Sequence, residues 1–211
     1  MKRLFLLAFG FLSCMSTAHA VEFGVDIGGS TLHSYTSSAN AWSSDRAFGG
    51  FEGRAEIGFS PEWRLGLGWH NTSNTGNLHQ HATDLGRNEW TVDGRYRYLL
   101  FDWLVPYARA GLGLARLRLT LDDWQTVIWT PELQLGAGVE LLLPRRAWSK
   151  DENPLPAFGV LFELGWEHLF SHDVTLQKQN SLQSGVATDD LALGALTLDG
   201  LLIRFAALVR F

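Results

Sequence analysis

The residues most suggestive of catalysis lie in segment 69–76, Trp-His-Asn-Thr-Ser-Asn-Thr-Gly. His70 and Ser73 are a pair of types in which an imidazole base can activate a hydroxyl nucleophile for attack on an ester. Residues three apart in a regular strand face opposite ways, so this pair needs a β-bulge to meet, with Asp93 or Glu167 orienting the histidine. The simpler interpretation, which we favour, is a strand that runs into a Ser/Thr/Asn/Gly-rich loop.

A second set of candidate ligands has the pattern His79-x-His81-x-x-Asp84. Imidazole and carboxylate groups suit Zn²⁺ or Cu²⁺. A polar loop lacks the rigid surroundings that hold such ligands in place, so we interpret this segment as a solvated loop. The same interpretation applies to His168 and His172. We therefore predict neither a metal nor a cofactor for this chain.

Charged residues also recur at every second position within otherwise apolar stretches. Residues two apart in a strand share a face, so these charges would line one side of a sheet. Inside a barrel each would need a partner of opposite sign, because burying one unpaired costs several kcal/mol. We predict an inward network of Arg–carboxylate pairs formed by Glu52, Arg54, Glu56, Arg64, Asp93, Arg95, Arg97, Arg109, Glu132, Glu140, Glu163, Glu167 and Arg204.

The elements that would position these residues are strands with a period of two. In 158–166, for example, Phe, Val, Phe, Leu and Trp alternate with Gly, Leu, Glu and Gly. No uninterrupted apolar run after residue 20 reaches the roughly 18 residues of a transmembrane helix. The alternation instead predicts eight strands, at residues 21–34, 47–59, 63–70, 89–98, 104–120, 127–143, 157–168 and 192–211.

The contents of the two strand faces indicate which one meets lipid. One face carries Trp, Phe, Leu and Val, and the other is mostly glycine mixed with Arg, Glu and Asp. A soluble barrel would present Lys, Thr, Ser and Glu to water, whereas an apolar exterior around a polar interior is typical of a transmembrane β-barrel. Two aromatic groups at opposite strand ends match interfacial girdles. They are Phe59, Trp63, Tyr98 and Trp103 at one end, and Trp69, Trp90, Trp129 and Trp166 at the other.

Residues 1–20 have the three zones of a secretory signal peptide. Two basic residues precede an apolar stretch at 4–12 and an A-x-A cleavage signal at 18–20. A lipoprotein site at Cys14 fits poorly because bulky residues precede it. Cleavage after residue 20 removes this single cysteine, so residues 21–211 carry neither a disulfide nor a Cys-ligated metal. It also leaves 15 basic against 22 acidic residues, a net charge of about −7 that disfavours nucleic acid as a partner.

The connections between the predicted strands alternate in character. Those at 60–62, 99–103 and 144–156 would face the periplasm with both termini. Those at roughly 35–46, 71–88, 121–126 and 169–191 would face outward, and three of these four are long and polar, as is usual for such barrels. In the fifth strand the apolar parity changes between Leu114 and Leu117, which indicates a β-bulge or a strand that rises clear of the membrane.

Several of these features together resemble the OmpA-type small outer-membrane barrels. The signal peptide, the eight amphipathic strands and the terminal Ile203-x-Phe205-x-Ala207-x-Val209-x-Phe211 carry the resemblance, and the segment beginning at Tyr107 is similar to the "PY…G.G" strand of that family. The resemblance implies an all-β, antiparallel up-and-down barrel of eight strands in the outer membrane of a Gram-negative bacterium. It also implies that the insertion machinery recognises the terminal aromatic strand, which makes Phe211 an assembly signal. No peptidoglycan-binding domain is expected after Phe211.

Segment 69–76 is in addition similar to the His-x-Ser-Asn of outer-membrane lipid A deacylases and outer-membrane phospholipase A. This sequence departs from that pattern by one residue, because it has His-x-x-Ser. The resemblance implies lipid-ester hydrolysis as an alternative function.

Our expectation from the sequence is a barrel at 21–211 with a structural or surface-interactive role and no enzymatic activity. Its expected partners are outer-membrane lipid and lipopolysaccharide, the assembly machinery through the C-terminal strand, and a partner outside the cell that contacts the long polar loops. The alternatives are the outer-leaflet esterase that uses His70 and Ser73, and a narrow solute pore. Since the interior of an eight-stranded barrel is just wide enough for side chains, a polar plug is favoured over a pore.

Overall fold

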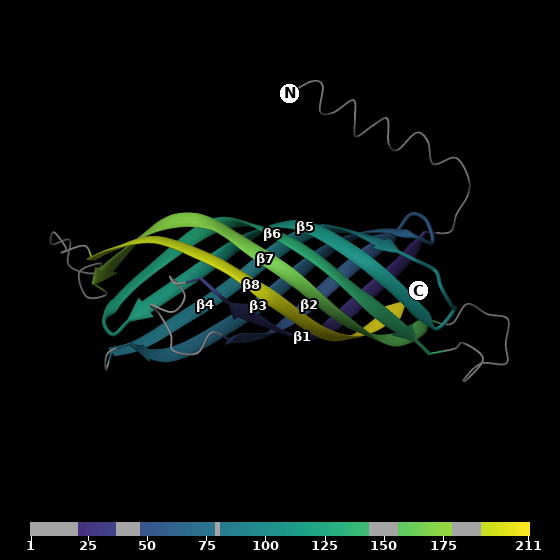
Figure 1. Cartoon of the computed structure of the whole chain (residues 1–211), viewed down its shortest axis with the longest axis horizontal. Coiled ribbons are helices and arrows are strands. Elements are labelled where there is room, and N and C mark those ends of the chain that lie inside the picture. Colours follow the sequence, from purple (N-terminus) through teal and green to yellow (C-terminus); the bar gives the residue numbers. More distant parts are fainter. Residues whose placement is uncertain (1–20, 37–46, 79–80, 144–155, 179–190) are drawn as a thin grey trace, which may run out of the picture.

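Eight antiparallel strands close into a single barrel in which β1 pairs with both β2 and β8 (Figure 1). The computed structural model describes residues 21–36, 47–78, 81–143, 156–178 and 191–211; the predicted signal peptide lies outside them. No described helix is long and apolar enough to cross a membrane. The strands are β1 Glu22–Ser34, β2 Ala47–Gly58, β3 Trp63–Leu78, β4 His81–Arg97, β5 Leu104–Leu121, β6 Trp124–Leu142, β7 Ala157–Lys178 and β8 Leu191–Arg210.

Both ends of the described chain lie at the same end of the barrel. Phe211 donates its backbone N–H to the carbonyl of Phe23 at 2.8 Å, which joins the last strand to the first. The connections at this end are short at 59–62 and 98–103. Since outer-membrane barrels have short periplasmic turns, this end faces the periplasm and the opposite end faces outward.

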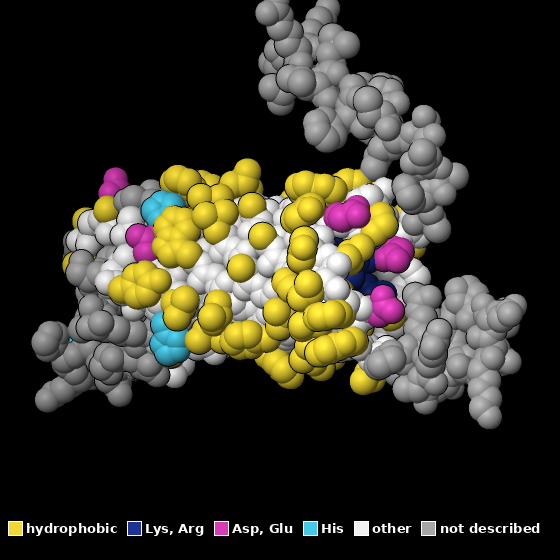
Figure 2. Space-filling view, turned by 45° about the vertical axis from the view of Figure 1, so that its right-hand side comes forward, with side chains coloured by type: hydrophobic (Ala, Val, Ile, Leu, Met, Phe, Trp, Pro, Cys, Tyr) yellow, Lys and Arg dark blue, Asp and Glu magenta, His cyan; other side chains and the backbone are white. Residues whose placement is uncertain are grey.

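The half of the barrel next to the termini has its apolar side chains on the outside. Leu67, Val92 and Leu112 are neighbours across β3, β4 and β5, and their side chains are 54%, 55% and 65% exposed. Figure 2 shows hydrophobic side chains spread over much of the outer surface. Such a surface is stable only in contact with lipid, so this half is the membrane-spanning part.

The strands continue well beyond the outer aromatic girdle, farther than the sequence predicts. One row of outward residues consists of Trp69, Trp90 and Leu114, and the next row consists of Asn71, Asn88 and Arg116. The prediction of a loop at 71–88 is therefore wrong, because all of these residues except 79–80 belong to β3 and β4. Polar composition suggested a loop, whereas these polar residues lie on a paired hairpin that faces water.

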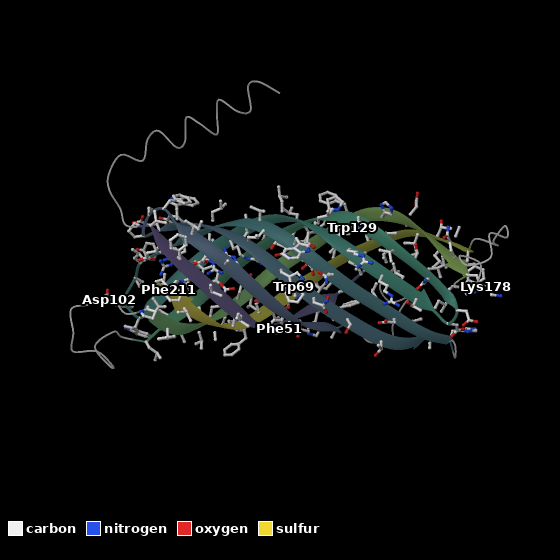
Figure 3. The ribbon with its side chains drawn as sticks, turned by 180° about the vertical axis from the view of Figure 1, so that it is seen from behind. Phe51, Trp69, Asp102, Trp129, Lys178 and Phe211 are labelled. Carbon is white, nitrogen blue, oxygen red and sulfur yellow. The ribbon has the colours of Figure 1, made fainter. Side chains whose placement is uncertain are left out.

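Two other outward connections are also shorter than predicted, whereas the strands on either side of 35–46 end and begin at the predicted residues. The loop expected at 121–126 is a turn at 122–123, where Asp122 has a positive φ of 48°. The strand predicted to end at residue 168 continues as β7 to Lys178. In Figure 3, Trp69 and Trp129 lie partway along the barrel, between Phe211 at one end and Lys178 at the other. We call the parts of the strands beyond the outer girdle the outer wall; they are residues 71–78, 81–88, 116–121, 124–128, 169–178 and 191–198.

Within the outer wall most apolar side chains point inward instead of outward, although Val127, Phe170, Leu191 and Leu193 are exposed. Leu117 and Leu119 of β5 are buried, whereas Arg116 and Arg118 between them are exposed. The parity change in the fifth strand is therefore not a bulge, since β5 pairs with β4 and β6 without a register shift. It marks the level at which the strand leaves lipid for water. The inward side chains form an apolar core made of Leu32, Phe48, Leu85, Ala115, Leu117, Leu119, Ile128, Leu169, Val174, Leu176, Leu196, Leu198 and Leu202.

Candidate functional site

On the periplasmic side of the apolar core, the interior of the barrel is filled by charged side chains. The structure places all thirteen charges predicted to point inward inside the barrel, where none is more than 5% exposed. They alternate with glycines such as Gly66, where an added Cβ would come within 2.3 Å of Arg54 Nη2. The glycines therefore provide the space that the long side chains occupy.

Arg95 lies at the centre of the part of this network that is nearer the periplasmic end. Its guanidinium contacts Glu140 Oε1 at 2.8 Å, Glu56 Oε2 at 3.3 Å and Asp26 Oδ2 at 3.5 Å. The guanidinium carbon also lies 4.3 Å from the centre of the Tyr107 ring, a cation–π contact. One cation thus joins carboxylates from three other strands.

The remaining predicted charges have partners of opposite sign as well, mostly from strands that are not hydrogen-bonded neighbours. These contacts are Arg54–Asp93 (2.9 Å), Arg64–Glu56 (3.1 Å), Arg97–Glu140 (3.2 Å), Arg109–Glu163 (2.8 Å) and Arg204–Glu52 (2.7 Å).

A second cluster surrounds Arg87, which sequence analysis missed. Arg87 Nη2 contacts Glu89 Oε2 at 2.7 Å, Glu132 Oε2 at 3.1 Å and Glu167 Oε1. Gln134 Nε2 donates to Glu132 Oε1 at 3.0 Å. The three glutamates present oxygens within 4.8 Å of one another, a spacing that could hold a metal ion. Because the guanidinium already lies among them, we interpret the cluster as an ion-pair centre.

Sequence analysis missed Asp26, Glu89 and Arg210 as well as Arg87. Two of these charges had a recognisable signal in the sequence. Asp26 and Arg210 are buried in the lumen, and each lies in a strand whose alternation the sequence shows. Arg87 and Glu89 had no such signal, because one fell in the predicted loop and the other at a predicted strand end.

His70 has a different hydroxyl partner from the one that the sequence suggested. Ser73 is exposed on the outer face, whereas His70 is buried in the lumen. The Nδ1 of His70 lies 2.8 Å from Glu89 Oε1, and its Nε2 is hydrogen-bonded to Ser30 Oγ. The contact between Nδ1 and Glu89 is an ion-pair distance and not a hydrogen bond, because Glu89 Oε1 has no hydrogen-bond partner among the described residues. The order hydroxyl, imidazole, carboxylate is that of a nucleophilic triad.

The space around this triad is too small for a lipid. The cavity that His70 lines together with Glu52, Thr91 and Arg204 has a volume of about 20 Å³, which is room for about one water molecule. On the outward side, the apolar core that includes Leu32 lies over it. The described residues therefore bring the triad together without a place for an ester substrate.

Of the candidate ligands in His79-x-His81-x-x-Asp84, only His81 and Asp84 are among the described residues. His79 lies outside the described residues, and the exposed His81 is bonded through Nδ1 to Asp122. Likewise His168 Nδ1 is bonded to Asp199, and its ring stacks against Trp166 with centroids 5.6 Å apart. Among the residues that the structure describes, His81 and His168 each have one carboxylate partner.

The predicted girdle residues lie on the outer surface. All are exposed except Trp69, which is partly exposed and donates its Nε1–H to Asn88 Oδ1 at 2.8 Å. Trp63 packs against Tyr96 with ring centroids 4.9 Å apart. Phe211 is 65% exposed at the periplasmic end, where an aromatic ring can sit at the membrane surface.

Comparisons with known proteins agree with this architecture. Among solved structures, a major outer membrane protein from Thermus thermophilus has a TM-score of 0.56 and 14% identity, over 92% of this chain and 100% of that chain. OprG from Pseudomonas aeruginosa has a TM-score of 0.54 and 11% identity, over 91% and 96%. Ail, the attachment invasion locus protein of Yersinia pestis, has a TM-score of 0.51 and 13% identity, over 92% and 100%.

At these identities the similarity extends to the fold alone. No curated protein sequence matches the chain. The sequence model of the outer membrane protein beta-barrel domain, however, matches residues 4–177. Together with the closed barrel of eight strands and its lipid-facing exterior, this match places the chain in the cell outer membrane. The chain belongs to the outer membrane protein β-barrel domain family.

Proposed function

We propose that this protein is a sealed, non-enzymatic barrel that holds a rigid recognition surface above the outer membrane. The observation that carries this proposal is the outer wall. Its strands remain paired beyond the girdle, except β6 with β7 between Gln125 and Glu132, and they enclose an apolar core. A folded wall presents side chains in fixed positions, which lowers the ordering cost of binding compared with a mobile loop.

The filled lumen argues against the narrow solute pore. Arg95, Glu140 and Glu163 are fully buried in the lumen, and a pore would have to break their ion pairs. The apolar core adds a second barrier on the outward side. A conducting state would thus cost several kcal/mol for each buried pair that it separates.

The esterase alternative has the Ser30–His70–Glu89 arrangement in its favour and the lack of space against it. Hydrolysis of a lipid ester requires the carbonyl carbon to lie about 3 Å from the nucleophile. The cavity of about 20 Å³ beside His70 does not admit an acyl chain. We therefore assign these three residues to packing and hydrogen bonding within the lumen.

We further propose that the partners lie at both membrane surfaces. Outside, the outer wall would contact another cell or a host surface; Ail, which has a similar fold, is described as an attachment invasion locus protein. Lipid and lipopolysaccharide would surround the apolar exterior. In the periplasm, the strand that ends at Phe211 would be recognised by the outer-membrane assembly machinery.

Attachment by cells that display the protein tests the proposal. Thr75, Asp84 and Thr120 form one outward row near the tip of the outer wall, and replacing all three with alanine leaves the core intact. We expect this variant to lose attachment to host-cell monolayers relative to wild type. The matched control, with Glu62 and Asp102 at the periplasmic turns replaced by alanine, should attach as wild type does. A surface-recognition role is contradicted if wild type, the triple alanine variant and the control variant attach equally. It is also contradicted if cells that lack the protein attach as well as wild type.

A further inference from the structure

We propose that Arg116 and Arg118 form a binding site for the phosphate groups of an outer-leaflet glycolipid. We call these residues the interfacial arginine pair. They are alternate residues on β5, so their side chains share the outward face, and both are exposed. This inference deepens the proposed contact with lipopolysaccharide and rests on it, because it assigns that contact to the level where the barrel leaves the membrane; it does not depend on attachment at the tip of the outer wall.

The register of the strands places the interfacial arginine pair at the boundary between lipid and water. Trp90 and Leu114 are directly opposite each other on β4 and β5, and the next outward positions are Asn88 and Arg116. Trp69 turns its indole N–H toward Asn88 Oδ1 at 2.8 Å. Since interfacial tryptophans keep the ring in the apolar layer and direct the N–H toward the polar layer, Arg116 lies at headgroup level.

A glycine lies beside the second arginine on the outward face. Arg118 is opposite Gly86 on β4, and Gly86 is opposite Ser73 on β3. An added Cβ at Gly86 would lie 4.0 Å from Arg118 Cβ, so this outward position holds no side chain between a guanidinium and a hydroxyl. A phosphate over Gly86 would receive hydrogen bonds from both groups, and the planar guanidinium binds two phosphate oxygens at once.

The charges of the interfacial arginine pair are uncompensated within the described part of the chain. All the buried arginines contact carboxylates in the lumen, whereas no described carboxylate forms an ion pair with Arg116 or Arg118. Asp84 is half-buried one row farther out, opposite Thr120. Because the chain as a whole carries a net charge of −5, two adjacent unpaired cations at headgroup level indicate an anionic ligand there.

Binding of lipid A to the folded barrel in neutral detergent micelles, followed by native mass spectrometry, tests this inference. Wild type should bind phosphorylated lipid A more tightly than the enzymatically dephosphorylated form. R116Q/R118Q should bind the phosphorylated form roughly 30-fold more weakly, at about fivefold per arginine, and should bind the dephosphorylated form as wild type does. R116K/R118K should fall between the two, because an ammonium keeps the charge without the two-pronged geometry.

The matched control is K150Q/K178Q, which removes the same two charges elsewhere; Lys178 is labelled in Figure 3 at the outward end of β7, and Lys150 lies outside the described residues. Compact migration of unboiled protein verifies folding of each variant. The inference is overturned if R116Q/R118Q binds phosphorylated lipid A within twofold of wild type, or if the control loses as much affinity. Equal binding of the two lipid forms by wild type also overturns it.

Discussion

Replacing Arg87 with methionine should destabilise the barrel more than any other single removal of a lumenal arginine. Glu132 and Glu167 form ion pairs with Arg87 and with no other described cation, and Glu89 has one further ionisable partner, His70. Methionine fills much of the space but leaves three buried carboxylates facing one another. Removing one partner of a buried ion pair costs about 3–5 kcal/mol, and the upper end applies here because no second arginine compensates.

Arg95→Met is the informative comparison, because Arg95 also contacts three carboxylates. Among these, Glu140 keeps Arg210 at 2.6 Å and Arg97 at 3.2 Å, and Glu56 keeps Arg54 at 2.9 Å. The remaining arginines can share the freed carboxylates, so we expect a loss near the lower end of the same range, about 3 kcal/mol.

Equilibrium unfolding in urea from lipid vesicles, followed by tryptophan fluorescence and by gel migration, measures both losses in the free energy of unfolding. Adding Glu132→Gln to Arg87→Met should recover part of the loss, because it removes one uncompensated charge. The reasoning is refuted if Arg95→Met is the more destabilising of the two. It is refuted equally if Arg87→Met costs less than about 1 kcal/mol, or if Glu132→Gln deepens the loss.

Three further predictions follow from the same structure. Deleting Phe211 should reduce the amount of assembled protein in cells far more than it reduces refolding into detergent. In detergent the free energy of unfolding should fall by only about 1.5–3 kcal/mol. Equal outer-membrane yields of wild type and the deletion variant would show that Phe211 is not an assembly signal. Leu117→Ala should lower the free energy of unfolding by about 2–5 kcal/mol, because it leaves a cavity in the apolar core. Leu112 faces lipid, so Leu112→Ala should lower the free energy of unfolding less. If urea titrations gave the reverse order, Leu117 would not lie in a packed apolar core. His70→Ala and Ser30→Ala should leave lipid A and phospholipid acylation unchanged, and loss of ester hydrolysis by purified protein would favour the enzyme alternative instead.

The sequence alone determined the barrel, its strand faces and the inward position of its predicted charges. Alternation is a local property, since neighbouring residues of a strand point to opposite sides whatever the strand pairs with. The burial of Glu163 and Arg204 and the exposure of Phe162 and Phe205 therefore agree with the pattern of β7 and β8 alone.

Which inward charges meet was decided by the tertiary structure. Arg204 on β8 bonds Glu52 on β2, and Arg87 on β4 bonds Glu167 on β7. Neither pair belongs to neighbouring strands. Such contacts depend on strand tilt, on register and on the small diameter of the lumen, none of which a single strand encodes.

The tertiary structure also decided where the membrane ends. Alternation identifies two faces without stating which one meets water, and in β5 the apolar face is outward at Leu112 and inward at Leu117. Lipid surrounds the half of the barrel next to the termini and favours apolar residues on its outer face. Water surrounds the outer wall and favours apolar residues on its inner face. Only the paired rows across β3, β4 and β5 place this reversal at one level, directly above Trp69 and Trp90.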